Sequence, residues 1–191
     1  MVLAEKYNLK IIEDNAESIG ATYKGRLLGT FGDASTYSFF GNKIITTGEG
    51  GAVLTNNKKV AIRCRELRDH GMSHKKRYHH VDLGYNYRMT NMQAAIGLAQ
   101  MEKLDDILVS RKKQMDFYYS ELSNIRGISL RKYANWCEPD HWLMTLTLND
   151  KYNRDEFLSH MKDKETYIKE AGTPEKPVWD VYCDYLDSMN V

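Results

Sequence analysis

A carboxylate, a hydroxyl and an amine follow the ends of two short apolar segments in this sequence. Asp14 ends the segment LKIIED, while Ser38 and Lys43 lie at and just beyond the end of ASTYSFF. If the two segments form neighbouring strands of an open α/β sheet, these side chains meet in the crevice beyond the strand ends, where such sheets bind ligands. The set suits pyridoxal phosphate, because the amine can condense with the aldehyde, the carboxylate can pair with the pyridine nitrogen, and the hydroxyl can donate to the phosphate.

Each of these residues also has a purely structural interpretation. Lysine is rarely buried without a partner, so Lys43 in a glycine-rich loop could simply be solvated. Asp14 could merely end a strand, and Ser38 could be a half-buried strand residue. The glycines that follow Lys43 match neither the phosphate-loop motif nor the dinucleotide fingerprint. Residue types and spacing alone therefore indicate an α/β domain and leave the site open.

The elements that must position these residues alternate between strand and helix. LKIIED, ASTYSFF and GAVLTN read as strands, and the glycine-broken segment between the first two reads as short strand pieces joined by turns. A helix that Asn56 caps and Gly71 closes is predicted next. This alternation is typical of α/β proteins.

A long helix is predicted after the polar, aromatic segment 70–88. Thr90 and Gln93 fit a capping box, apolar residues then recur at close to helical spacing, and Gly127 follows the last of them. Thirty or so residues would make roughly 50 Å of helix, a length that usually joins two bodies. A further strand in HWLMTLTLND and a helix in NRDEFLSHMKDK indicate the second body.

Composition narrows the class of protein. The net charge of +1, from 27 basic and 26 acidic side chains, argues against a dedicated role in binding nucleic acid or a membrane surface. No segment has the ~20 apolar residues of a membrane helix, and the absence of a signal peptide at the start favours a cytoplasmic location. Cys64, Cys137 and Cys183 are predicted to be reduced thiols.

A histidine-bearing basic loop could in principle bind a metal ion. His74, His79 and His80 lie close together in sequence, but no cysteine or carboxylate at metal-ligand spacing accompanies them. A solvated loop near a dimer interface is the preferred interpretation, and contact with a substrate diphosphate is a minor alternative. No metal site is predicted.

The ordered motifs resemble a known family. The stretch IIEDNAESIGATYKGRLLGTFGDASTYSFFGNKIITTGEGGAVLTN, then LRDHG, then LGYNYRMTNMQAAIGLAQMEKLD are similar to the DegT/DnrJ/EryC1/StrS family of pyridoxal-phosphate-dependent nucleotide-sugar aminotransferases. The resemblance covers about Lys6 to Thr147. It implies an α/β chain with a partial PLP-dependent transferase (aspartate aminotransferase, type I) fold: part of the large-domain mixed sheet over 1–90, a long linking helix over 91–126, and an incomplete small α+β domain over 127–191.

The resemblance also implies roles for five residues. Lys43 matches the catalytic Schiff-base lysine, Asp14 the carboxylate on the pyridine nitrogen, and Ser38 the phosphate-binding serine. Asn86 matches an asparagine that reaches the phosphate from the partner subunit. Glu17 stands where the family often has glutamine, near the ring hydroxyl, and its carboxylate would alter the electronics of the ring.

Two neighbours of Asn86, Tyr85 and Arg88, are further possible contacts. A related dehydratase branch has histidine at the lysine position, so Lys43 favours transamination, with its amine moving a proton between the cofactor's C4′ carbon and the sugar carbon. The resemblance implies glutamate as amino donor and a keto sugar on a nucleotide diphosphate as acceptor. The segment from SFFGNK to TTGEGG is most similar to the corresponding segment of perosamine-synthase-type enzymes. These enzymes aminate a 4-keto-6-deoxy hexose for amino-sugar and polysaccharide biosynthesis.

The family is dimeric with shared active sites, so a homodimer is expected. Full-length members carry an N-terminal half before the segment IIED and more chain after Lys151, so this chain resembles a fragment, and weak or absent catalysis by the chain alone is expected. A non-catalytic remnant that serves as a structural or partner-binding module is the alternative. A weaker option is a family member whose reaction is not on a sugar.

Overall fold

The computed structural model describes residues 1–170, so Trp179, Cys183 and the end of the predicted small domain lie outside the described residues. Contacts between residues divide the chain into two units. The first contains Met1–Met115 and Tyr133–Leu143, and the second contains Asp116–Lys132 and the residues from Met144 onward. Residues 133–143, which lie within the small domain predicted over 127–191, thus cluster with the first unit.

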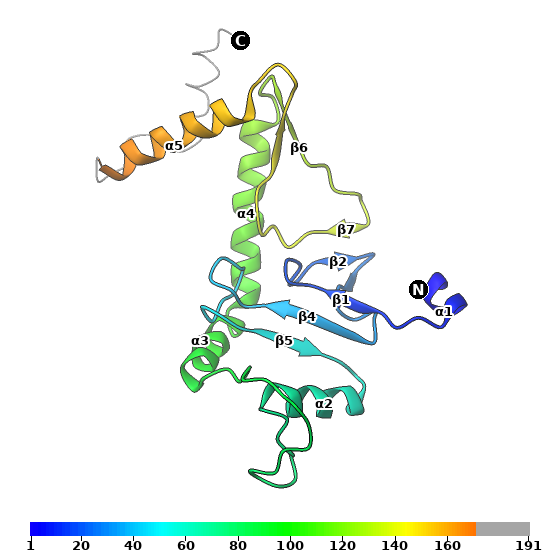
Figure 1. Cartoon of the computed structure of the whole chain (residues 1–191). Coiled ribbons are helices and arrows are strands. Elements are labelled where there is room, and N and C mark those ends of the chain that lie inside the picture. The colour runs from blue at the N-terminus through cyan, green and yellow to red at the C-terminus, as the bar shows by residue number, and fades with distance from the viewer. Residues whose placement is uncertain (171–191) are drawn as a thin grey trace. The chain divides into compact units, whose positions relative to one another are not determined.

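A mixed three-stranded sheet forms the centre of the first unit (Figure 1). Its order is β1 (Ile12–Asp14), β4 (Ala34–Ser38), β5 (Gly51–Leu54). β1 runs parallel to β4, with Asp14 opposite Thr36, and β5 runs antiparallel to β4. The two strands predicted to carry the candidate site are therefore direct neighbours, and their carboxyl ends lie at the same edge.

A smaller antiparallel sheet lies in the same unit. The glycine-broken segment forms a hairpin of β2 (Thr22–Tyr23) and β3 (Arg26–Leu27), and β2 also pairs with β7 (Cys137–Glu138). The turn places Lys24 and Gly25 at positive φ, 52° and 75°, as a tight hairpin turn requires. The chain begins with a short helix, α1 (Val2–Tyr7).

Helix α2 (Lys58–Arg68) begins one residue later than predicted. Asn57, not Asn56, is the cap: its side-chain oxygen accepts from Lys59 N and Val60 N at 2.9 and 3.4 Å. Two adjacent asparagines have the same capping chemistry, so their types alone could not decide between them. The helix ends at Arg68 with Asp69 as its C-cap, three residues before the predicted closing residue Gly71. Gly71 still supports this end, because its N–H donates to Glu66 O at 2.9 Å, with φ +66°. A Cβ on Gly71 would collide with the carbonyl oxygen of Asp82.

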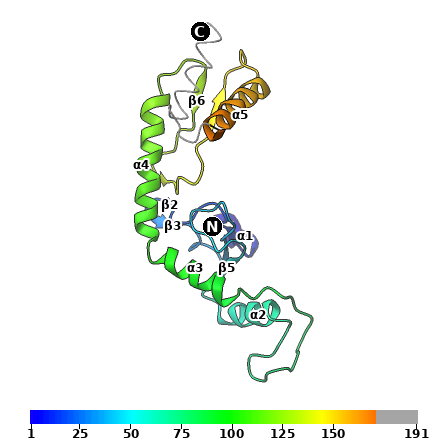
Figure 2. The ribbon, with the colours of Figure 1, turned by 90° about the vertical axis from the view of Figure 1, so that its left-hand side faces the viewer.

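The single helix predicted over 91–126 is two helices, α3 (Asn91–Met101) and α4 (Leu104–Leu122). The capping box of Thr90 and Gln93 is confirmed. Lys103 N donates to Gln100 O at 3.0 Å, a tightened turn that ends α3. The two aspartates that follow at 105 and 106 suit the positive N-terminal end of a new helix. Figure 2 shows α3 and the start of α4 as separate helices that meet at an angle.

The second unit has a small core of its own. β6 (Ile128–Leu130) pairs antiparallel with β8 (Leu146–Leu148), and α5 (Arg154–Glu170) follows. The buried residues Leu122 and Phe157 are surrounded by Tyr118, Ile125, Ile128, Leu130, Met144, Leu148, Tyr152 and Met161. This core confirms the strand and helix predicted after residue 140.

Two further features of residues 1–170 bear on function. None of the helices there is both long and apolar enough to span a membrane. The same residues contain no group of three or more His, Cys, Asp or Glu side chains that could hold a metal ion. Cys64 and Cys137 are free thiols.

Candidate functional site

Lys43 is held by two side chains from distant parts of the sequence. Its Nζ lies 3.0 Å from Glu17 Oε1 and 3.8 Å from the centroid of the Trp142 ring. The Lys43 side chain is only 13% exposed, whereas that of Glu17 is 60% exposed. The interpretation of Lys43 as a simply solvated lysine is therefore wrong.

The loop that carries Lys43 is fixed on both sides of it. Ile44 and Ile45, the next two residues, are buried at 7% and 2% exposure. The Gln100 side chain on α3 then clamps Thr46, accepting from its N–H at 3.0 Å and donating to its carbonyl at 2.8 Å. An apolar pair followed by an amide clamp thus orients the lysine at the rim of the unit.

Asp14 and Ser38 lie on one face of the sheet. Asp14 is opposite Thr36, and Ser38 comes two residues after Thr36, so all three side chains point the same way. Asp14 Oδ1 accepts from Ala16 N at 3.1 Å and from Thr36 Oγ1 at 3.5 Å. Ser38 Oγ accepts from Phe40 N at 3.3 Å, an arrangement in which its own O–H can still donate to an anion.

A cavity of only about 10 Å³ joins part of this set. Glu17, Ser38 and Lys43 line it together with Asp140 and Trp142. Asp14 shares the sheet face of Ser38 but does not line the cavity. The donor set of amine, hydroxyl and carboxylate fits pyridoxal phosphate in kind. The space is that of about one water molecule, because the indole of Trp142 lies against the amine.

Asn86 lies apart from this cavity. Its backbone forms a bridge with Asp69, and its neighbours Tyr85 and Tyr87 stack with ring centroids 5.0 Å apart and planes at 6°. Arg88 Nη1 lies 3.3 Å from Asp69 Oδ2. The structure therefore does not bring Asn86 to Lys43 within one chain, and the role expected of it at a partner's phosphate stays a prediction.

Sequence reasoning missed Glu13, whose carboxylate organises a loop. It accepts hydrogen bonds from the N–H groups of Gly29, Phe31 and Gly32 at 2.7, 2.7 and 2.6 Å. The available signal was a carboxylate inside an apolar strand that precedes a glycine-rich loop. Glu13 faces away from Asp14 and supports the sheet from the other side.

Sequence reasoning also missed Asp140 and Trp142 as neighbours of the candidate lysine. No motif or spacing in the sequence links Trp142 to Lys43. Burial raises the pKa of the Asp140 carboxyl above its ordinary value of 3.8, and the charge of Glu17 raises this pKa further. The hydrogen bond from the backbone N–H of Trp142 and the charge of Lys43 oppose the shift.

Asp140 gives a pH prediction. Because its pKa is raised on folding, the folded state binds this proton more tightly than the unfolded state, and the free energy of unfolding falls as pH rises from 3.8 through the raised value. The Asp140→Asn variant carries no such proton. We expect it to gain stability over the parent as pH rises to neutrality and to match it in acid, measured by urea unfolding across pH. A stability difference that is constant with pH would contradict this.

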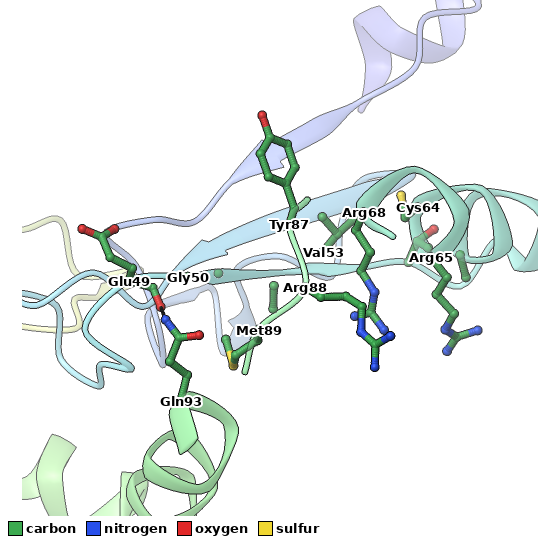
Figure 3. A pocket seen from close by; sticks show the side chains of 14 residues that line it. Glu49, Gly50, Val53, Cys64, Arg65, Arg68, Tyr87, Arg88, Met89 and Gln93 are labelled. Atoms are coloured by element: carbon green, nitrogen blue, oxygen red, sulfur yellow. Dashed lines mark hydrogen bonds between the residues drawn. The ribbon is translucent and has the colours of Figure 1, made fainter. Parts of the chain in front are cut away.

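A larger hollow of about 730 Å³ lies against β5 and α2 (Figure 3). Arg65, Arg68 and Arg88 line it together with Tyr87 and Gln93. These arginines have structural explanations: two lie in the last turn of α2, where positive charge offsets the helix dipole, and the third pairs with Asp69. The candidate lysine does not line this hollow.

Comparison with known proteins identifies the family of the chain. The model of the DegT/DnrJ/EryC1/StrS aminotransferase family matches residues 1–182. GDP-perosamine synthase of Escherichia coli O157:H7 is 43% identical over 162 residues, 85% of this chain and 44% of that protein. GDP-perosamine synthase of Caulobacter vibrioides is 50% identical over 123 residues, 64% of this chain and 33% of that protein.

A solved structure supports the same family and fold. The aminotransferase DesV of S. venezuelae superposes with a TM-score of 0.76 at 34% identity, over 85% of this chain and 43% of its own. The predicted α/β class and partial type I PLP-dependent transferase fold are thereby confirmed. The chain spans less than half the length of the relatives it matches. It belongs to the DegT/DnrJ/EryC1/StrS aminotransferase family.

Proposed function

We propose that this chain serves the transamination of a nucleotide-linked keto sugar, with pyridoxal phosphate as cofactor and Lys43 as the residue that carries it. The observation behind the proposal is the geometry of Lys43. A largely buried amine is paired with Glu17 at 3.0 Å, and it shares a cavity with the Ser38 hydroxyl beyond the end of a strand. An amine in a fixed position at a ligand-binding edge suits both condensation with an aldehyde and proton transfer.

Each residue has a separate task in this proposal. Bound pyridoxal phosphate supplies an aldehyde and an electron-accepting ring. Lys43 Nζ would hold the cofactor at its aldehyde, and the amine would then move a proton to and from the reacting carbon of the substrate. Asp14 would hold the proton on the ring nitrogen, Ser38 would donate to the phosphate, and Glu17 would orient Nζ through the ion pair already present.

The names of the relatives support the proposed substrate class. Two of them carry the name GDP-perosamine synthase, and we propose a 4-keto-6-deoxy hexose on a nucleotide diphosphate as the acceptor. Glutamate as amino donor, a role in polysaccharide biosynthesis and a cytoplasmic location are part of the same proposal.

A shared site between two copies of the chain completes the proposal. Asn86 does not line the Lys43 cavity of its own chain, and we propose that it acts on a phosphate in a neighbouring chain. The sheet also ends in β5, where Val53 and Leu54 are 51% and 52% exposed. Within the described residues the outer edge of this strand has no partner strand, and such edges favour pairing with another chain. A homodimer is the assembly that we propose.

One observation favours a second candidate function. The cavity at Lys43 is closed by Trp142 to about 10 Å³, so the chain could persist as a non-catalytic module that binds a partner through its exposed sheet edge. The two candidates differ in whether the cofactor and a keto sugar react at all.

The experiment is a stoichiometric incubation of the chain with pyridoxal phosphate, glutamate and a GDP-linked 4-keto-6-deoxyhexose, with the sugar followed by mass spectrometry. We expect slow formation of the amino sugar that requires glutamate, and slower formation from the UDP-linked analogue. Protein that retains the cofactor yet forms no amino sugar would favour the non-catalytic module.

A further inference from the structure

The indole of Trp142 is fixed at both ends over the candidate amine. Its ring centroid lies 3.8 Å from Lys43 Nζ, and its Nε1–H donates to the carbonyl of Asn42, the preceding residue, at 2.7 Å. The ring therefore cannot turn away from the amine without losing a hydrogen bond to the lysine loop. The other side of the amine faces Glu17.

The segment that carries Trp142 is itself anchored in the first unit. β7 pairs with β2, with Cys137 opposite Tyr23, and Lys24 N–H donates to the carbonyl of Trp136 at 2.7 Å. These backbone bonds hold residues 133–143 beside the hairpin. The position of Trp142 thus depends on strand pairing and not only on its own side chain.

We propose that Trp142 is a positioning residue for Lys43: it holds the amine toward Glu17 and controls the access of carbonyl compounds to Nζ. This inference rests on the proposed function of Lys43. A cation over an indole face is attracted by the electron density of the ring, and the attraction grows when water is excluded. With the cavity reduced to about 10 Å³ and the lysine 13% exposed, a carbonyl compound reaches Nζ only when the ring moves.

A core-packing role would predict different surroundings. A tryptophan that only fills a core contacts apolar side chains, whereas the face of Trp142 contacts an ammonium group, and its cavity is shared with two carboxylates, Glu17 and Asp140. The hydrogen bond from the indole of Trp142 to the carbonyl of Asn42 also joins two residues that are 100 positions apart in the sequence.

The test measures how fast limiting acetic anhydride acetylates Lys43, by peptide mass, relative to Lys10, whose side chain is 79% exposed. Loss of a partly desolvated cation–π contact is expected to raise the relative rate in Trp142→Leu about tenfold. Trp142→Phe keeps an aromatic face and is expected to stay close to the parent. The matched control is Trp136→Leu, since Trp136 packs edge-on against Tyr23 at 5.0 Å. Equal rates in Trp142→Leu and the parent would overturn the inference.

A second measurement does not depend on the folding of Trp142→Leu. Replacing Trp136 and Trp179 by phenylalanine leaves Trp142 as the only tryptophan of the chain. Acetylation of Lys43 is then expected to change the emission of Trp142, because the ammonium on its ring is lost. An emission spectrum that does not change would overturn the inference.

Trapping of pyridoxal phosphate separates this inference from the proposed function. If borohydride traps the cofactor on Lys43 at the same rate with and without Trp142, the function of Lys43 stands and the inference is overturned. If acetylation of Lys43 is faster in Trp142→Leu but no variant traps the cofactor on Lys43, the positioning contact stands and the proposed function is contradicted.

Discussion

Replacing Lys43 by alanine is expected to abolish amino-group transfer and to leave the fold intact. The amine is the group that we assign to both cofactor attachment and proton transfer, and a positioned acid–base group alone contributes about 10²–10⁴-fold to a rate. The fold should tolerate the change, because the loop is held by buried Ile44 and Ile45 and by the Gln100 clamp. Single-turnover amination followed by mass spectrometry measures the loss, and circular dichroism checks the fold.

Lys24→Ala is the matched control for this variant. Lys24 Nζ also lies over an aromatic ring, that of Tyr23, at 5.4 Å, but it does not line the cavity of Lys43. We expect Lys24→Ala to react like the parent chain. A Lys43→Ala rate within a factor of a few of the parent would show that the amine is not the reacting group.

Replacing Glu13 by alanine is expected to lower the free energy of unfolding by about 2 to 4 kcal/mol. The carboxylate accepts three backbone hydrogen bonds of 2.6–2.7 Å, and its loss leaves the N–H groups of Gly29, Phe31 and Gly32 without that acceptor. Hydrogen bonds to a charged group are stronger than neutral ones, and part-buried donors regain water only in part. Urea unfolding measures the change.

Two controls separate this effect from a general loss of charge. Glu13→Gln keeps one carbonyl oxygen and is expected to lose less stability than Glu13→Ala. Glu5→Ala removes an exposed carboxylate from α1 and is expected to change stability by less than about 0.5 kcal/mol. Equal unfolding free energies for Glu13→Ala and Glu5→Ala would contradict a structural role of the loop carboxylate.

The candidate strands could be predicted because their pattern is local. Short apolar runs that end in Asp14 and Ser38, with turn residues between them, define strands and their direction without any tertiary information. The capping box of Thr90 and Gln93 could be predicted equally well, because it depends only on a spacing of three residues. These local signals predicted the two strands, and the structure shows that the strands are neighbours, through the parallel pairing of β1 with β4.

The interruption between α3 and α4 could not be predicted from periodicity. Apolar residues keep helical spacing on both sides of Glu102 and Lys103, and neither residue is a helix breaker. Only the hydrogen bond from Lys103 N to Gln100 O reveals the tightened turn. The spacing of apolar side chains thus predicts the buried face of a helical segment, but it does not predict whether the segment forms one helix or two.

The closure of the site by Trp142 is a tertiary property. Its indole bonds to the carbonyl of Asn42 across 100 residues, and the intervening segments carry no spacing that links them. The raised pKa of Asp140 has the same origin, since it depends on burial beside Glu17 and Lys43. The resemblance to the family singled out the lysine, and the fold shows which side chains surround it.

Covalent trapping of the cofactor tests the central claim most directly. The purified chain is mixed with pyridoxal phosphate and reduced with borohydride, and the modified residue is located by peptide mass, with Lys43→Ala in parallel. The account predicts an adduct confined to Lys43 that is absent from the variant. Labelling spread over exposed lysines such as Lys10 and Lys24, or no labelling, would contradict the assignment of Lys43 as the residue that carries the cofactor.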